Sequence, residues 1–91
     1  MIKPSDLYIT KEEFNKIILD GEFKFMKERA EMDPKDRKKC VQFWVPLTSN
    51  DIPVEYIYEL EESYINAGWD NVQVVFVNDR TTSLMIYLSI D

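Results

Sequence analysis

The stretch YELEESYINAGWDNVQVVFVNDRTTSLMIYLSID, residues 58–91, decides the fold of this chain. It begins as an acidic helix, stops at Gly68, and continues into two segments rich in β-branched and aromatic residues, 71–77 and 83–90. A turn-rich loop of hairpin length, residues 78–82, separates these segments. The stretch therefore predicts a helix followed by a hairpin whose strands are apolar on both faces.

The helix that leads into the hairpin has a predicted start, an apolar face and a predicted end. Pro53 suits the first helical turn, and Asn50 or Asp51 can cap it. Gly68 predicts a left-handed stop, and Trp69 after it favours a Schellman arrangement. An apolar stripe recurs at helical spacing through Ile57, Leu60, Tyr64 and Ala67, widened by Val54 and Ile65.

A third strand is predicted before this helix, in CVQFWVPL, residues 40–47. Apolar residues alternate there with Cys40, Gln42 and Trp44, which is the period of a strand, and Pro46 indicates a sheet edge. The strand order is 1-2-3 or 1-3-2. We favour 1-3-2 because residues 84–88 are apolar on both faces, as in a central strand.

A first helix is predicted over residues 11–31. Thr10 and Glu13 have the spacing of a capping box. Gly21, in the middle of the helix, either permits a close approach by another element or marks a break. Its apolar positions at helical spacing are Phe14, Ile17, Ile18 and Phe25.

These elements predict one α+β domain, in which a helix precedes a β-α-β-β unit with a three-stranded mixed sheet packed by helices. We divide the chain into an N-terminal arm (1–9), the first helix (10–32), a charged connector (33–39) and the β-α-β-β unit (40–91). The second helix covers one face of the sheet. The other face is covered by the first helix or by a second subunit, and we expect a homodimer or higher oligomer. The expected self-association residues are Trp44, Val75, Val77, Met85 and Tyr87.

The composition excludes several classes of chemistry. The chain has no histidine, one cysteine and two glycines, so it lacks the commonest acid–base side chain, a zinc-type cysteine spacing and a glycine-rich phosphate loop. We therefore expect no enzymatic activity, no metal and no cofactor. The net charge of −6 argues against general nucleic-acid binding, which depends on neutralising phosphates.

The sequence predicts no membrane-spanning segment and no signal peptide. No apolar run approaches the roughly 18 residues that cross a bilayer, and the N-terminus lacks the basic-then-apolar pattern of a signal peptide. The single Cys40 cannot form an internal disulfide, which fits a reducing compartment. These features predict a cytoplasmic protein with no membrane partner.

Charge is unevenly distributed along the chain. The net charges of residues 1–23, 24–39 and 51–91 are −2, +3 and −7. Within the acidic part, a row of carboxylates at helical spacing predicts either a solvated helix face, a surface for a basic partner protein, or a mimic of a nucleic-acid backbone. We take the partner-binding residues to be Glu55, Glu59, Glu62 and the exposed aromatic Tyr56.

The basic connector has the opposite charge. Arg37, Lys38 and Lys39 lead into the strand that holds Trp44. Cations beside an aromatic ring can hold a phosphate-bearing small molecule or a nucleotide. The alternative is a solvated connector that offsets the acidic helices.

The chain also resembles the small accessory proteins of tailed bacteriophages. The resemblance rests on a capped helix beginning Thr10-Lys11-Glu12-Glu13-Phe14, the charged connector, and a strand–helix–strand–strand unit whose helix ends in Ala67-Gly68-Trp69. It implies a non-enzymatic protein of the host cytoplasm that binds and modulates or inhibits a host protein, including defence proteins. The alternatives it implies are a sponge for a nucleotide signal and a minor virion or assembly subunit. No site residue is carried over from it.

Overall fold

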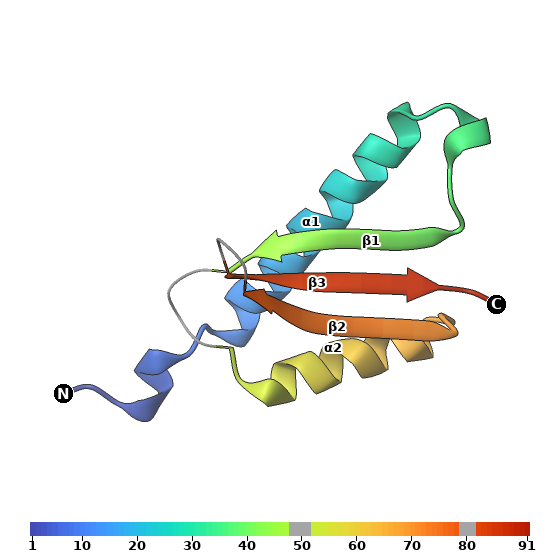
Figure 1. Ribbon diagram of the computed structural model, residues 1–91. Helices are drawn as coiled ribbons and strands as arrows, with labels where there is room; N and C mark the ends of the chain where they lie inside the picture. The colour runs from blue at the N-terminus through green and yellow to red at the C-terminus, as the bar shows by residue number, and fades with distance from the viewer. Residues whose placement is uncertain (48–51, 79–81) are drawn as a thin grey trace.

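The computed structural model describes residues 1–47, 52–78 and 82–91 (Figure 1). It confirms the α+β class. The proposed caps Asn50 and Asp51, and most of the predicted hairpin loop, lie outside the described residues. The elements are α1 (Lys11–Glu31), β1 (Cys40–Pro46), α2 (Val54–Asn66), β2 (Asn71–Asn78) and β3 (Thr82–Ser89), with short 3-10 helices at Pro4–Leu7 and Pro34–Asp36.

The three strands form one sheet in the order β1-β3-β2, which confirms β3 as the central strand. β3 is antiparallel to both neighbours, so the expectation of a mixed sheet is wrong. The reason is topological. The crossover through α2 makes β1 and β2 parallel, and β3 returns between them after a hairpin. A mixed sheet would have required β1 to pair directly with β2.

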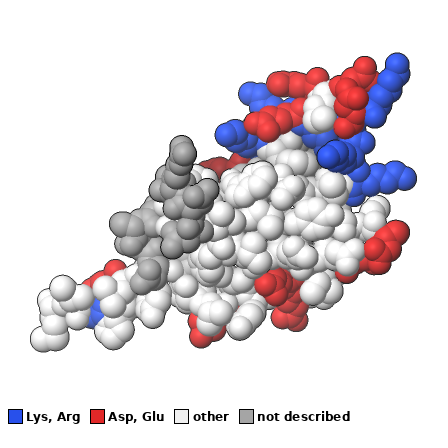
Figure 2. All heavy atoms as spheres, viewed as in Figure 1, with Lys and Arg blue, Asp and Glu red and all other residues white. Residues whose placement is uncertain are grey.

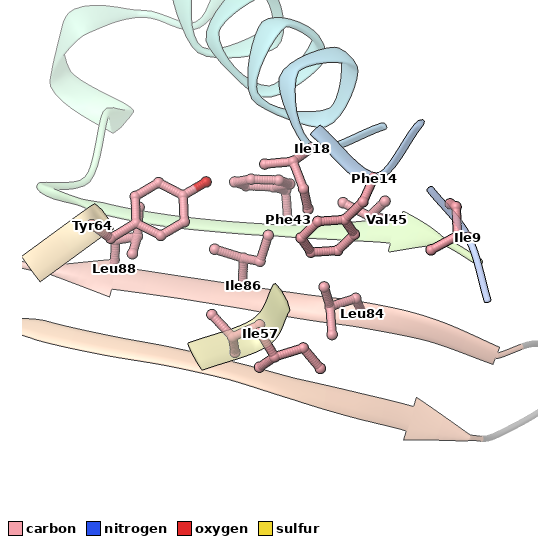
Figure 3. Close-up of a cluster of buried hydrophobic side chains, with 11 residues drawn as sticks. Ile9, Phe14, Ile18, Phe43, Val45, Ile57, Tyr64, Leu84, Ile86 and Leu88 are labelled. Atoms are coloured by element: carbon pink, nitrogen blue, oxygen red, sulfur yellow. The ribbon is translucent and has the colours of Figure 1, made fainter. Parts of the chain in front are cut away.

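Both α-helices lie on the same face of the sheet (Figure 1). α1 packs over β1 and α2 packs over β2, so the two helices and that face enclose one core (Figure 3). Leu84 and Ile86 of β3 are 0% exposed at its centre. The other members of the core are Ile9, Phe14, Ile18, Phe43, Val45, Ile57, Tyr64, Val74 and Leu88.

α1 is a continuous helix, and its glycine marks a close contact. The hydroxyl of Thr10 accepts a hydrogen bond from the backbone N–H of Glu13 at 3.1 Å, as the capping pattern predicts. A Cβ atom at Gly21 would lie 3.0 Å from Phe43 Cε2 and 3.1 Å from Val45 Cγ2. Gly21 therefore allows β1 to approach α1 closely, and it does not break the helix.

α2 ends as predicted but starts differently. Pro53 is its N-cap residue and lies just outside the first turn, without a side-chain capping bond. At the other end, Gly68 has a φ of 113°. Its N–H donates to Ile65 O at 3.1 Å, and the N–H of Trp69 donates to Tyr64 O at 3.3 Å. This pair of bonds is the predicted Schellman motif.

Candidate functional site

The sheet face opposite the helices is open across the described part of the chain. Alternation along the strands directs every second side chain toward it. The register places Trp44 beside Met85, and Met85 beside Val75, so these three form a row across the sheet. Tyr87 lies one step along β3 from this row and Val77 one step along β2. The structure thus brings all five predicted self-association residues onto one surface.

This surface is apolar at its centre and has no charged side chains. Trp44 is 55% exposed and Val75 43% exposed, while Val77, Met85 and Tyr87 are half-buried by their cross-strand neighbours. None of the three strands contains a lysine, arginine, aspartate or glutamate. Figure 2 views this face, and charged side chains appear only around its margin. The face therefore carries no local charge that would select a charged partner.

The predicted acidic surface on α2 is divided between two environments. Glu55 and Glu62 are exposed. Glu59 instead forms an ion pair with Lys11 of α1. The Lys11 ammonium also lies 4.7 Å from the centroid of the Tyr56 ring, which places this part of α2 against α1. Only part of the carboxylate row is therefore free for a partner.

Tyr56 is half-buried, so the expectation that it is exposed is wrong. Its ring centroid lies 5.6 Å from that of Phe14, because this side of α2 faces α1. The exposed tyrosine of α2 is Tyr58, at 62%. Tyr58 falls on the other side of the helix from the apolar stripe that contains Ile57 and Tyr64, and this spacing could have predicted its exposure.

The predicted phosphate-binding cluster is also divided. Arg37 turns back onto the end of α1, where Nε donates to Arg29 O and Nη2 donates to Ala30 O, each at 3.0 Å. A guanidinium in that place satisfies orphan carbonyls and opposes the negative end of the helix dipole. Lys38 and Lys39 remain exposed. Trp44 lies on the open sheet face, so its predicted association with this cluster is not formed.

The aromatic residue that shares a groove with Lys38 and Lys39 is Trp69. These three side chains line a groove of about 630 Å³ on the helix side of the molecule, together with Met26, Arg29 and Val41. Four separate segments of the chain contribute to it. The sequence therefore offered no local motif by which the groove could have been recognised.

A hydrogen bond links the two helices. The hydroxyl of Tyr64 donates a hydrogen bond to Glu22 Oε1 at 2.5 Å. Burial of the phenol, followed by this bond and the charge of Glu22, raises the pKa of Tyr64 well above its usual value. Tyr64 is therefore neutral at physiological pH and ties α2 to α1.

Comparison with protein-family models, with curated proteins and with solved structures finds no match to this chain. Within the described ranges, no helix is long and apolar enough to cross a membrane. The same residues contain no cluster of three or more histidine, cysteine, aspartate or glutamate side chains placed to hold a metal ion.

Proposed function

We propose that this chain is a non-enzymatic binding protein that forms a homodimer through the open face of its sheet. In the dimer, the exposed acidic side of α2 remains free to bind a basic surface of another protein. The observation that supports this function is the uncovered sheet face, which has an apolar centre and no charged residue in any strand.

The size of the face limits the interface that it can form. Three strands spaced about 4.8 Å apart, each about seven residues long, give a footprint of roughly 14 by 24 Å, or roughly 340 Å². Gln42 and Gln73 flank Tyr87 on this face, so its contiguous apolar part is smaller than the footprint and does not exceed the roughly 300–600 Å² of the largest patches on typical monomers, which are often functional. Because the footprint is below the roughly 800 Å² per partner of a standard interface, we expect a dimer of modest affinity.

The side chains of the open face favour a second copy of this chain as its binding partner. A two-fold axis parallel to β3 would superpose β1 of each subunit on β2 of the other. The large Trp44 then lies opposite Val75 of the partner subunit, and Met85 lies opposite Met85 of the partner subunit. The large Trp44 thus meets a smaller side chain at equal height along the strands, as in facing layers that interdigitate, and Met85 meets its own copy on the axis.

Self-association is tested by sedimentation of the wild-type protein and of a Trp44→Glu/Met85→Glu variant. We expect the wild type to be a dimer at about 100 μM, and the variant to be a folded monomer, because apposed carboxylates repel each other in an apolar interface. Leu19→Glu/Phe23→Glu is the matched control, since it adds the same two charges at positions that are 61% and 73% exposed on α1. A monomeric wild type, or a variant that still dimerises, would contradict the proposal.

The acidic side of α2 is tested by cross-linking in the expression host. We expect the Glu55→Lys/Glu62→Lys variant to remain dimeric and to lose partners that the wild type captures, because charge reversal repels a basic surface. Glu12→Lys/Glu28→Lys makes the same change in net charge on exposed positions of α1 and should retain those partners. Equal loss by both variants would show that only net charge matters and would exclude the α2 surface.

A further inference from the structure

The two helices diverge toward their C-terminal ends (Figure 1). Residues of the last turns of α1 and of the end of α2 line the groove on the helix side, together with Val41 near the start of β1 and Ile90 after β3. At the end of α2, Ala67 has only a methyl group and Gly68 has no side chain, so they place little bulk beside the groove. A Cβ atom at Gly68 would meet nothing within 4 Å. The volume of about 630 Å³ lies in the usual range of small-molecule sites.

The groove is lined by apolar side chains and by basic side chains. Met26, Val41 and Trp69 contribute apolar surface to the groove. Arg29, Lys38 and Lys39 contribute positive charge, and no acidic residue lines the groove. In the part of the chain that the structure describes, no carboxylate lies within ion-pair distance of either lysine. The groove is therefore an apolar cleft with unneutralised cations at its mouth.

We propose that this groove binds a small amphipathic anion, namely a carboxylate with an aliphatic body of medium length. The carboxylate lies between Lys38 and Lys39, where charge-assisted hydrogen bonds are available. The aliphatic body covers Met26, Val41 and Trp69 and removes their apolar surface from water. The groove's apolar side chains Met26, Val41 and Trp69 lie on the helix side of the sheet, away from Trp44 and Met85 of the open face.

The same chemistry disfavours a nucleotide. A nucleobase has donors and acceptors along its edges, and leaving them unpaired in an apolar cleft costs free energy. Apart from the cations at the rim, the side chains that line the groove offer few partners for such edges, the Trp69 indole being one. A nucleotide would place its phosphate on the lysines but would leave its base poorly matched.

The site is tested with dodecanoate as the probe and the fluorescence of Trp69 as the signal. The Trp44→Phe background removes the other tryptophan from the signal. We expect saturable binding below about 1 mM, and stronger quenching by a terminally brominated dodecanoate, since bromine quenches an indole that it contacts. AMP in the same assay should bind at least about tenfold more weakly. Tighter binding of AMP, or no binding of dodecanoate, would overturn the proposal.

Two variants identify the groove as the place of binding. Lys38→Glu/Lys39→Glu should weaken dodecanoate binding at least about tenfold, because it replaces attraction with repulsion at the carboxylate. Lys16→Glu/Lys27→Glu makes the same change in net charge at exposed positions on α1 and should bind normally. Ala67→Phe changes an exposed residue without altering charge and should block the cleft by filling it. Normal binding by the Lys38/Lys39 variant or by Ala67→Phe would overturn the assignment.

Discussion

Replacement of Ile86 by alanine is expected to lower the free energy of unfolding by about 4 kcal/mol. Ile86 is 0% exposed at the centre of β3, between Phe43 of β1 and Val74 of β2. Truncation removes buried methyl groups and leaves a cavity that the paired strands on either side cannot close. Because small domains are stable by only about 5–15 kcal/mol, this loss is a large share of the total. Urea denaturation monitored by circular dichroism measures it.

Met85→Ala is the matched control, one residue away on the same strand. Met85 points to the open face and is half-buried, so its truncation should cost less than about 1 kcal/mol at a protein concentration too low for self-association. At higher concentration the same variant should also weaken the dimer. If Met85→Ala and Ile86→Ala destabilised the monomer equally, both helices could not lie on one face of the sheet.

Replacement of Gly21 by leucine is the second large expected effect, a loss of about 3 kcal/mol in the free energy of unfolding. Even a Cβ atom at this position would lie 3.0 Å from Phe43 Cε2, so a longer side chain must push β1 away from α1. The higher helix propensity of leucine, about 1 kcal/mol better than glycine, offsets only part of this cost. Chemical denaturation with circular dichroism detection measures the difference.

Asp20→Leu is the control for Gly21→Leu. Asp20 is exposed on the same turn of α1, so leucine there should change stability by less than about 0.5 kcal/mol. A Gly21→Leu protein as stable as the wild type would mean that α1 and β1 are further apart than the structure shows. The comparison therefore tests the helix–sheet contact that leaves the opposite face uncovered.

Arg37 and Tyr56 show why single side chains were assigned to the wrong surroundings. Each lies in a segment with a recognisable local pattern, a basic run and an amphipathic helix. Their neighbours in space, however, come from α1, which directly precedes the connector of Arg37 and is distant in sequence from Tyr56. Arg37 binds the carbonyls at the end of α1, and Tyr56 packs on Phe14. Local spacing reports which face of an element a residue occupies, and it does not report what lies opposite that face.

The sequence by itself determined the two helices, the three strands, the Schellman motif at Gly68 and the residues on each side of the sheet. These features follow from local periodicity and backbone preferences, and the two-sided apolar pattern of β3 was enough to place it at the centre. The antiparallel sheet follows from that central position, because the crossover makes β1 and β2 parallel and the hairpin reverses β3. Only the tertiary structure decided that both helices cover one face and that Trp69 joins Lys38 and Lys39 in a groove. Those outcomes depend on contacts between distant segments, above all the approach of α1 to β1 at Gly21, which no short stretch of sequence specifies.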